Sequence, residues 1–284
     1  MKEGEPSYTA KQVAASRAAH LRFDPAPHVL EDRFAELLLG SDAGALIDLY
    51  ADGGLWILQE NRIFLPLRAR YAEDLVFESH RAGVRQLVVL GAGLDSFGLR
   101  RPAPLSDLRV IEVDHPATQR WKRQRLADLA IPVPDHLSFV ECDFAATSLT
   151  SALHGTAFRA GDPAVVSWMG VVYYLDRSTV RQALAELAAL LAPSSAVVLD
   201  FMLPLEVLPQ RCREIHDAMS AHLGQAGEPQ VNRYLPDEIR AEFIAAGFAR
   251  VDLASSDEIH RRHLGPAAPK RSRAERFGIA VGWR

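Results

Sequence analysis

The chain has 284 residues with a formal net charge of −4, and 48% of the residues are hydrophobic and 24% are charged. These values are ordinary for a globular protein of one large domain or about two smaller ones, and they exclude collagen, coiled-coil and wholly disordered proteins. A protein that coats nucleic acid would normally be basic, so we expect no nucleic-acid partner.

The N-terminal residues 1–65 are predicted to form a helical cap, in which Asp24-Pro-Ala-Pro27 separates two helices. The first residues lack the apolar core of a signal peptide, and no apolar run approaches the roughly 18 residues that span a bilayer. Two cysteines, Cys142 and Cys212, are too few for a disulfide framework, and no metal-ligand spacing surrounds them. We therefore expect a reduced, cytoplasmic protein with no membrane partner and no metal.

The middle of the chain alternates between two kinds of pattern. Five short apolar runs bounded by turn residues predict buried strands. These runs span residues 86–90, 109–114, 137–142, 163–168 and 195–202. Helical patterns lie between them and begin near Pro66, Pro116 and Asp176, where a proline or a capping side chain favours a helix start. Strands that alternate with helices predict a parallel sheet wrapped by helices.

The end of the chain departs from this alternation. Residues 204–235 form an insert after the fifth strand, and a further helix is predicted to start at Pro236. Two more strands, at 250–254 and 278–283, are joined by a connector that reads as a loop, which suggests an antiparallel pair at one edge of the sheet. We therefore predict one α/β domain over residues 66–284, with the N-terminal cap and the insert as a helical lid.

A glycine turn, Gly91-Ala92-Gly93, directly follows the first strand. Glycines at such a turn let the backbone bend sharply and approach a ligand closely. The second strand ends in Glu112-Val-Asp114, and an acid at that place can hold the hydroxyls of an adenosine ribose. Either acid could do so. Asp114 is preferred because it lies nearer the carboxyl end of the strand, where ligands bind in open α/β sheets.

The residues after the turn indicate which nucleotide is bound. A dinucleotide fingerprint needs a third glycine, but Ser96 stands there, and Asp95 would repel a pyrophosphate. S-adenosylmethionine fits better than NAD or FAD, because it has an adenosine, no phosphate, and cationic sulfonium and ammonium groups. Asp143 and Phe144 follow the third strand and are then placed to bind the adenine amine and ring edge.

Four motifs carry a resemblance to a known family. They are Arg68-Ala-Arg70-Tyr71, the turn from Leu90 to Phe97, Glu112-Val-Asp-His-Pro116, and the run from Trp168 to Leu175. Together they resemble the leucine carboxyl methyltransferase family, which includes bacterial polyketide O-methyltransferases. The resemblance implies a class I methyltransferase fold, a Rossmann-like seven-stranded sheet with an antiparallel last strand. It also implies that Arg70 grips the methionyl carboxylate of S-adenosylmethionine.

The fourth motif departs from the family pattern. Members usually carry a glutamate after the tryptophan, where it is expected to touch the amino group of the cofactor, but here Met169 follows Trp168. A backbone carbonyl, such as that of Ser167 or Trp168, could take over this contact, or the cofactor is bound less tightly. The loss of an interaction with a charged group costs on the order of 1.5–3 kcal/mol.

Candidate residues for the acceptor side come from two places. Tyr173 and Tyr174 follow the fourth strand, and His216, His222 and Arg233 lie in the insert. A carboxylate acceptor is already ionised and needs only a cationic or hydrogen-bonding clamp, for which Arg233 or the basic segment 261–273 is a candidate. A phenol acceptor would instead benefit from a histidine base.

We therefore expect an enzyme that methylates a carboxylate of a small acid, such as a polyketide-type intermediate of secondary metabolism, and that acts as a monomer or homodimer. Methylation of a phenol, nitrogen or carbon is the alternative within the same enzyme class. Two other hypotheses place the protein outside the methyltransferases. One is a nicotinamide-dependent oxidoreductase, against which Ser96 argues. The other is a non-catalytic S-adenosylmethionine-binding protein on the same scaffold.

Overall fold

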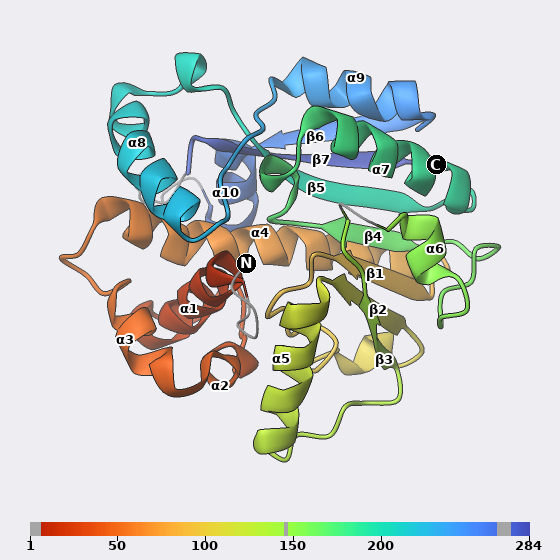
Figure 1. Cartoon of the computed structure of the whole chain (residues 1–284), viewed down its shortest axis with the longest axis horizontal. Coiled ribbons are helices and arrows are strands. Elements are labelled where there is room, and N and C mark those ends of the chain that lie inside the picture. The colour runs from red at the N-terminus through yellow and green to blue at the C-terminus, as the bar shows by residue number, and fades with distance from the viewer. Residues whose placement is uncertain (1–6, 145–146, 266–273) are drawn as a thin grey trace.

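A seven-stranded sheet with helices on both faces forms the centre of the molecule (Figure 1). The computed structural model describes residues 7–144, 147–265 and 274–284, without the side chains of residues 217–218 and 221–222. The strands run in the order β3-β2-β1-β4-β5-β7-β6, and β7 is antiparallel to both β5 and β6. This sheet confirms the predicted fold class.

The five parallel strands coincide with the five apolar runs. They are β1 (Gln86–Leu90), β2 (Arg109–Asp114), β3 (Leu137–Glu141), β4 (Val165–Trp168) and β5 (Ala196–Met202). Every residue of β1 and β5 is buried, because helices cover both faces of a parallel sheet and leave no face for solvent. Val89 of β1 lies in register with Glu112 of β2 and Ser167 of β4, so these three strands end at one edge.

Separate hydrophobic cores join the helices to the sheet. On one face lie α4 (Trp56–Arg81) and α10 (Ser256–Leu264), and on the other lie α6 (Leu149–Leu153), α7 (Arg177–Leu190) and α9 (Pro236–Ala246). A third core joins the N-terminal helices α1 (Tyr8–Phe23), α2 (Phe34–Leu39) and α3 (Ala43–Asp48) to α5 (Pro116–Asp128). The break predicted at Asp24–Pro27, between α1 and α2, is confirmed.

The helix start predicted at Pro66 is wrong, because α4 begins at Trp56 and carries Pro66 in its interior. A proline removes one helical N–H donor. The neighbouring side chains of Phe64 and Leu67 are fully buried in the core, and this packing keeps the helix continuous. The boundary drawn between residues 65 and 66 therefore falls inside a single helix.

The loop predicted between the last two strands is also wrong, since α10 lies between β6 (Arg250–Ser255) and β7 (Phe277–Trp283). Ser255 and Glu258 form a capping box at its start, with the Ser255 N–H donating to the Glu258 carboxylate at 2.7 Å. Only Ile259 and Leu264 among its nine residues are apolar, and so few apolar positions do not distinguish a short helix from a polar loop. The antiparallel pairing of β6 and β7 is as predicted.

The insert at 204–235 contains α8 (Gln210–Gln225), and Figure 1 shows α8 on the same side of the molecule as α1, α2 and α3. Short 3₁₀ turns lie at η1 (Gly40–Asp42), η2 (Ala103–Leu105), η3 (Val172–Tyr174) and η4 (Leu205–Val207). Within the described residues, no helix is both long enough and apolar enough to cross a membrane, and no group of three or more His, Cys, Asp or Glu side chains is placed to hold a metal ion.

Candidate active site

A cavity of about 370 Å³ lies at the carboxyl ends of β1, β2 and β4. Small-molecule sites typically occupy roughly 300–1,000 Å³. The start of α1, the middle of α4 and residues 227–229 of the insert complete the cavity wall. The predicted site residues that line it are Gly91, Ala92, Gly93, Asp95, Asp114, Asp143, Phe144, Met169, Tyr173 and Tyr174.

The glycine turn places backbone against the cavity. Gly91 and Gly93 have φ angles of +64° and +53°, a region that side chains with a Cβ rarely adopt. The Gly91 N–H donates to the Val113 carbonyl at 2.8 Å, which joins the turn to β2. A Cβ on Gly91 would lie 2.3 Å from Val171 Cγ2, so both space and conformation require glycine at this position.

Asp114 ends β2 and holds the glycine turn. Its carboxylate accepts hydrogen bonds from the N–H of Gly93 and from the N–H of His115, the latter at 2.6 Å. Burial raises the pKa of Asp114. A carboxylate has about four lone-pair sites, so Asp114 keeps acceptor capacity for the hydroxyls of a ligand in the cavity.

The other acid of β2, Glu112, does not reach the cavity. Its carboxylate is fully buried and pairs with Lys122 Nζ, which also donates to the Asp95 carbonyl at 2.5 Å. Burial raises the pKa of Glu112 to about 7. Strand alternation places Glu112 on the same face as Asp114, but one step deeper in the strand, where Lys122 of α5 neutralises it. Of the two acids that the sequence left open, only Asp114 lines the cavity.

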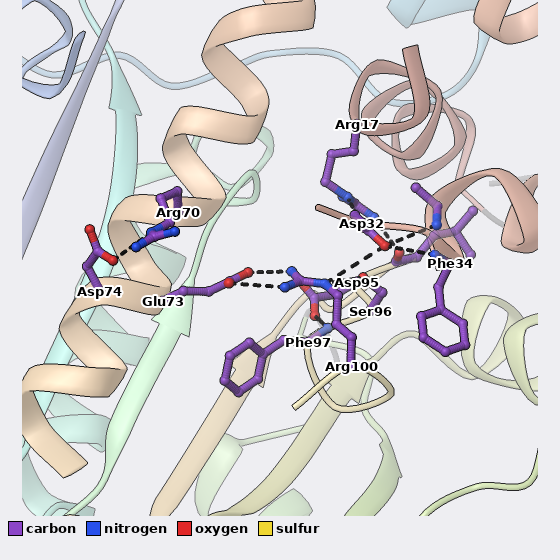
Figure 2. Close-up of polar contacts among 12 residues, drawn as sticks. Arg17, Asp32, Phe34, Arg70, Glu73, Asp74, Asp95, Ser96, Phe97 and Arg100 are labelled. Atoms are coloured by element: carbon purple, nitrogen blue, oxygen red, sulfur yellow. Dashed lines mark hydrogen bonds and ion pairs between the residues drawn. The ribbon is translucent and has the colours of Figure 1, made fainter. Parts of the chain in front are cut away.

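The arginine prediction needs correction. Arg70 lies on the outer side of α4, where it pairs with Asp74 at 2.7 Å and stays 46% exposed (Figure 2). Arg68 is buried and lines the cavity instead. Each residue advances a helix by about 100°, so two arginines two positions apart face nearly opposite sides.

The sequence contains a signal for Arg68 but none for the second cavity arginine, Arg17. Leu65, Arg68, Ala72 and Val76 recur at intervals of three or four residues and are all buried, and this spacing is that of the buried stripe of a helix. Arg17 comes from α1, far away in the sequence, and only the packing of the N-terminal cap brings it to the cavity.

Tyr173 and Tyr174 form the cavity wall at η3. Arg68 Nη1 pairs with the fully buried Asp200 at 2.8 Å and donates to Tyr173 Oη at 3.2 Å. Burial raises the pKa of Tyr173 well above its usual range and the pKa of Tyr174 to about 12. Both phenols are therefore protonated near neutral pH and can donate a hydrogen bond to a ligand.

A sequence profile described as "Leucine carboxyl methyltransferase" matches residues 10–188, which is more than half of the chain. The chain belongs to the leucine carboxyl methyltransferase family. A Bacillus subtilis relative, "Putative S-adenosyl-L-methionine-dependent methyltransferase YktD", is 29% identical over 281 residues, which cover 92% of each chain. A Mycobacterium tuberculosis relative, "Putative S-adenosyl-L-methionine-dependent methyltransferase Rv3787c", is 33% identical over 206 residues, which cover 69% of this chain and 66% of the relative.

Solved structures support the fold of this family member. A crystal structure titled as a putative methyltransferase from Thermobifida fusca superposes with a TM-score of 0.61 at 17% identity, over 99% of this chain and 96% of the other. A protein from Streptomyces avermitilis, titled as a duf574 family protein, superposes with a TM-score of 0.59 at 14% identity, over 99% and 98% of the two chains. At these identities the likeness shows the fold alone. Family membership identifies the chain as an S-adenosylmethionine-dependent methyltransferase.

In this methyltransferase, Trp168 does not present its side chain to the cavity. It is 1% exposed within the core on the other side of the strand, whereas Ser167 and Met169 line the cavity. Successive side chains of a strand point to opposite faces, so the predicted contact of Trp168 with the cofactor does not hold for its side chain. Met169, in the place of the family glutamate, does face the site.

The insert residues predicted for catalysis, His216 and Arg233, lie outside the cavity. Arg233 Nη2 and His216 Nδ1 are 3.0 Å apart, and Arg233 Nη1 donates to the Leu203 carbonyl at 2.9 Å. These contacts hold the insert against the end of β5 and leave neither side chain in the site. The side chain of His222 lies outside the described residues.

The basic C-terminal segment does not supply a clamp from its described residues. Arg261 and Arg262 pair with Asp257 and Glu78, and the side chains of both pairs are about half exposed. Neither arginine lines the cavity. Residues 266–273, which hold the remaining candidates of this segment, lie outside the described residues.

Glu228 of the insert closes the cavity against α1, a role that no sequence pattern indicated. Its carboxylate accepts from the N–H groups of Tyr8 and Thr9 at 2.9 and 3.0 Å, and from the hydroxyls of Ser7 and Thr9. The first turn of a helix has unpaired N–H groups that favour an acid. Glu228 thus ties the insert to the N-terminal cap over the cavity, where the lid was expected.

The charges of the cavity wall suit a cationic cofactor. Two arginines, Arg17 and Arg68, line the cavity together with five acids, which are Glu73, Asp95, Asp114, Asp143 and Glu228. Each arginine is already paired with an aspartate behind the wall, Arg17 with Asp32 and Arg68 with Asp200. A wall with excess negative charge attracts cations, and this fits the sulfonium and ammonium groups of S-adenosylmethionine.

Proposed function

We propose that this methyltransferase transfers a methyl group to a carboxylate oxygen of a small acid, such as a polyketide-type intermediate. The observation that carries the proposal is that Tyr173 and Tyr174 line the cavity and bring two phenol hydroxyls, which are protonated at neutral pH and can donate hydrogen bonds to an anion. The cavity histidine, His115, accepts the Ala117 N–H at the start of α5 and follows Asp114 directly in the chain. A carboxylate has a pKa near 4 and is ionised at neutral pH, so it needs donors and no base.

In this proposal the residues at the sheet edge hold the cofactor. Asp114 accepts hydrogen bonds from the ribose hydroxyls, and Asp143 and Phe144 bind the adenine. Arg68 takes the role first expected of Arg70: although it is paired with Asp200, a guanidinium group has five N–H donors and can also bind the methionyl carboxylate. When bound, S-adenosylmethionine supplies an electrophilic methyl carbon on a cationic sulfur.

Tyr173 holds the acceptor in the same proposal. Arg68 donates to the Tyr173 oxygen at 3.2 Å, so the phenol hydrogen is left to donate to another group. Asp200 fixes Arg68 at 2.8 Å and thereby orients the phenol. The chain then acts mainly by placing the acceptor oxygen beside the methyl carbon, an effect worth up to ~7–11 kcal/mol.

A labelled-methyl assay with matched acids and methyl esters tests the proposal. Free acids are expected to accept the methyl group and their methyl esters to accept none, because an ester has no anionic oxygen left to attack the methyl carbon. The measurement is radiolabel transferred from S-adenosylmethionine to a panel of small aromatic and aliphatic acid–ester pairs. Equal labelling of acid and ester would place the methyl group on another atom and contradict the proposal.

The proposal also predicts a flat pH profile. We expect kcat at saturating substrate to stay constant from about pH 6 to about pH 9, because the acceptor is ionised throughout and the pKa of Tyr174 is about 12. A histidine base would instead make kcat fall as the pH drops through about 6.5. Such an acidic limb would count against a carboxylate acceptor.

An uncharged phenol is the second candidate acceptor. Both cavity arginines are paired with buried aspartates, so among the described residues the wall offers a bound anion no unpaired cation. The five acids of the wall would oppose an anionic acceptor. The ester assay and the pH profile separate this candidate from the carboxylate, since a phenol accepts methyl without a free acid and benefits from a base.

A further inference from the structure

Five charged side chains, Arg17, Asp32, Glu73, Asp95 and Arg100, gather behind the glycine turn, and Figure 2 shows them together. Arg17 pairs with Asp32 at 2.7 Å, and Arg100 Nε lies 3.8 Å from the same carboxylate. Arg100 also holds Glu73 with two hydrogen bonds, that of Nη1 being 3.1 Å long. We call these five residues the charge cluster.

The charge cluster carries more negative than positive charge, because three carboxylates face two guanidinium groups. Burial raises the pKa of Glu73, and the nearby carboxylates of Asp95 and Asp32 raise it further against the effect of Arg100. Burial also acts to raise the pKa of Asp32, but Arg17 and Arg100 outweigh it and the pKa is lowered. The excess negative charge, which the two guanidinium groups do not balance, therefore lies on the side of the cluster formed by Glu73 and Asp95.

This negative side of the cluster faces the cavity. Glu73 and Asp95 line the cavity together with Arg17, but Arg17 is already paired with Asp32 behind the wall. Arg100 also lies behind the cavity. Asp95 Oδ1 accepts the Phe97 N–H at 2.7 Å, which fixes its carboxylate in the loop. Each carboxylate has about four lone-pair sites, so both acids keep acceptor capacity toward the cavity.

The neighbouring cations do not supply the missing positive charge. Lys122 pairs with the buried Glu112, and Arg68 pairs with the buried Asp200. Each of these cations is thus held by a carboxylate outside the charge cluster. A cationic ligand group in the cavity would balance the cluster.

Met169 lines the same cavity, and its thioether cannot pair with a cation as a carboxylate does. We propose that Glu73, assisted by Asp95, binds the α-ammonium group of S-adenosylmethionine, a contact that Met169 cannot make. An ammonium group brings one positive charge and up to three N–H donors. Arg68 and Glu73, both on α4, would then bind the two charged groups of the methionine end, Arg68 the carboxylate and Glu73 the ammonium group.

Calorimetric binding of two ligands tests this proposal. S-adenosylhomocysteine carries the amino-acid end, whereas 5′-methylthioadenosine has the same thioether-linked adenosine without it. We expect the wild-type protein to bind S-adenosylhomocysteine more tightly. Glu73→Gln is expected to weaken that binding about tenfold or more and to leave 5′-methylthioadenosine binding unchanged, because only the first ligand has an ammonium group.

Asp74→Asn is the matched control, since Asp74 follows Glu73 on α4 but pairs with the exposed Arg70. It is expected to leave both affinities unchanged. If Glu73→Gln does not fold, Asp95→Asn provides the same test, because its amide oxygen can still accept the Phe97 N–H. Equal loss for both ligands, no selective loss in a folded variant, or a wild-type protein without preference would each overturn the proposal. The readout is binding, so it does not depend on which acceptor is methylated.

Discussion

Asp114→Ala is expected to weaken the binding of S-adenosylmethionine by ~100-fold or more. The carboxylate is the proposed acceptor for the ribose hydroxyls, and hydrogen bonds to a charged group contribute about 1.5–3 kcal/mol each. Asp114 also accepts the N–H groups of Gly93 and His115, so alanine additionally releases the glycine turn that approaches the ligand. Calorimetry with S-adenosylmethionine and with S-adenosylhomocysteine measures the loss.

Two comparisons make this result specific to the site. Asp114→Asn keeps an oxygen for the Gly93 N–H and should bind with intermediate affinity. Asp128→Ala, at the exposed end of α5, should bind as the wild type does. Thermal unfolding without ligand shows whether the Asp114 variants are folded. Unchanged affinity in a folded Asp114→Ala protein would remove Asp114 from the binding site.

Arg68→Met is expected to lower the free energy of unfolding by about 3–5 kcal/mol. The substitution leaves the fully buried Asp200 without its guanidinium partner, and an uncompensated buried charge is strongly destabilising. Asp200 would still accept the Gly170 N–H at 2.5 Å, but one neutral donor does not offset a buried charge. Urea unfolding at neutral pH measures the difference.

Arg70→Met is the matched control for this second prediction. It removes a pair with Asp74 in which the arginine is 46% exposed, and such surface pairs contribute about 0–1 kcal/mol. The double variant Arg68→Met/Asp200→Leu should regain much of the lost stability, because neither charge is then left buried alone. Equal destabilisation by the two single arginine variants would contradict the placement of Arg68 in the interior.

The sheet could be predicted because its signals are local. The strands at 86–90 and 109–114 are continuous apolar runs bounded by turn residues, and they form β1 and β2 with the same bounds. Local patterns fail where packing overrides them. Pro66 lies inside α4 because the buried residues on both sides of it keep the helix continuous. α10 has only two apolar residues, Ile259 and Leu264, so its sequence resembles a polar loop.

The cofactor side of the site could also be predicted in part. Parallel strands end at a common edge, so the residues directly after β1 and at the end of β2 must lie close together. Gly91, Gly93 and Asp114 meet there. The choice between Glu112 and Asp114 could not be made from alternation alone. It depends on Lys122 of α5, which neutralises the deeper acid.

The sequence by itself determined the features that depend on neighbours in the chain. These are the alternation of strand and helix patterns, the glycine turn, the acid that ends the second strand and the motifs of the family. Only the tertiary structure decided which charged side chains reach the cavity. Arg68 and Asp200 are 132 residues apart, and Arg68 and Tyr173 are 105 apart. Likewise, His216 lies with Arg233 outside the site, whereas Glu73 lines the cavity and is held there by Arg100, which lies behind it. A buried charge must find its partner wherever the fold supplies one, and that pairing leaves no local trace in the sequence.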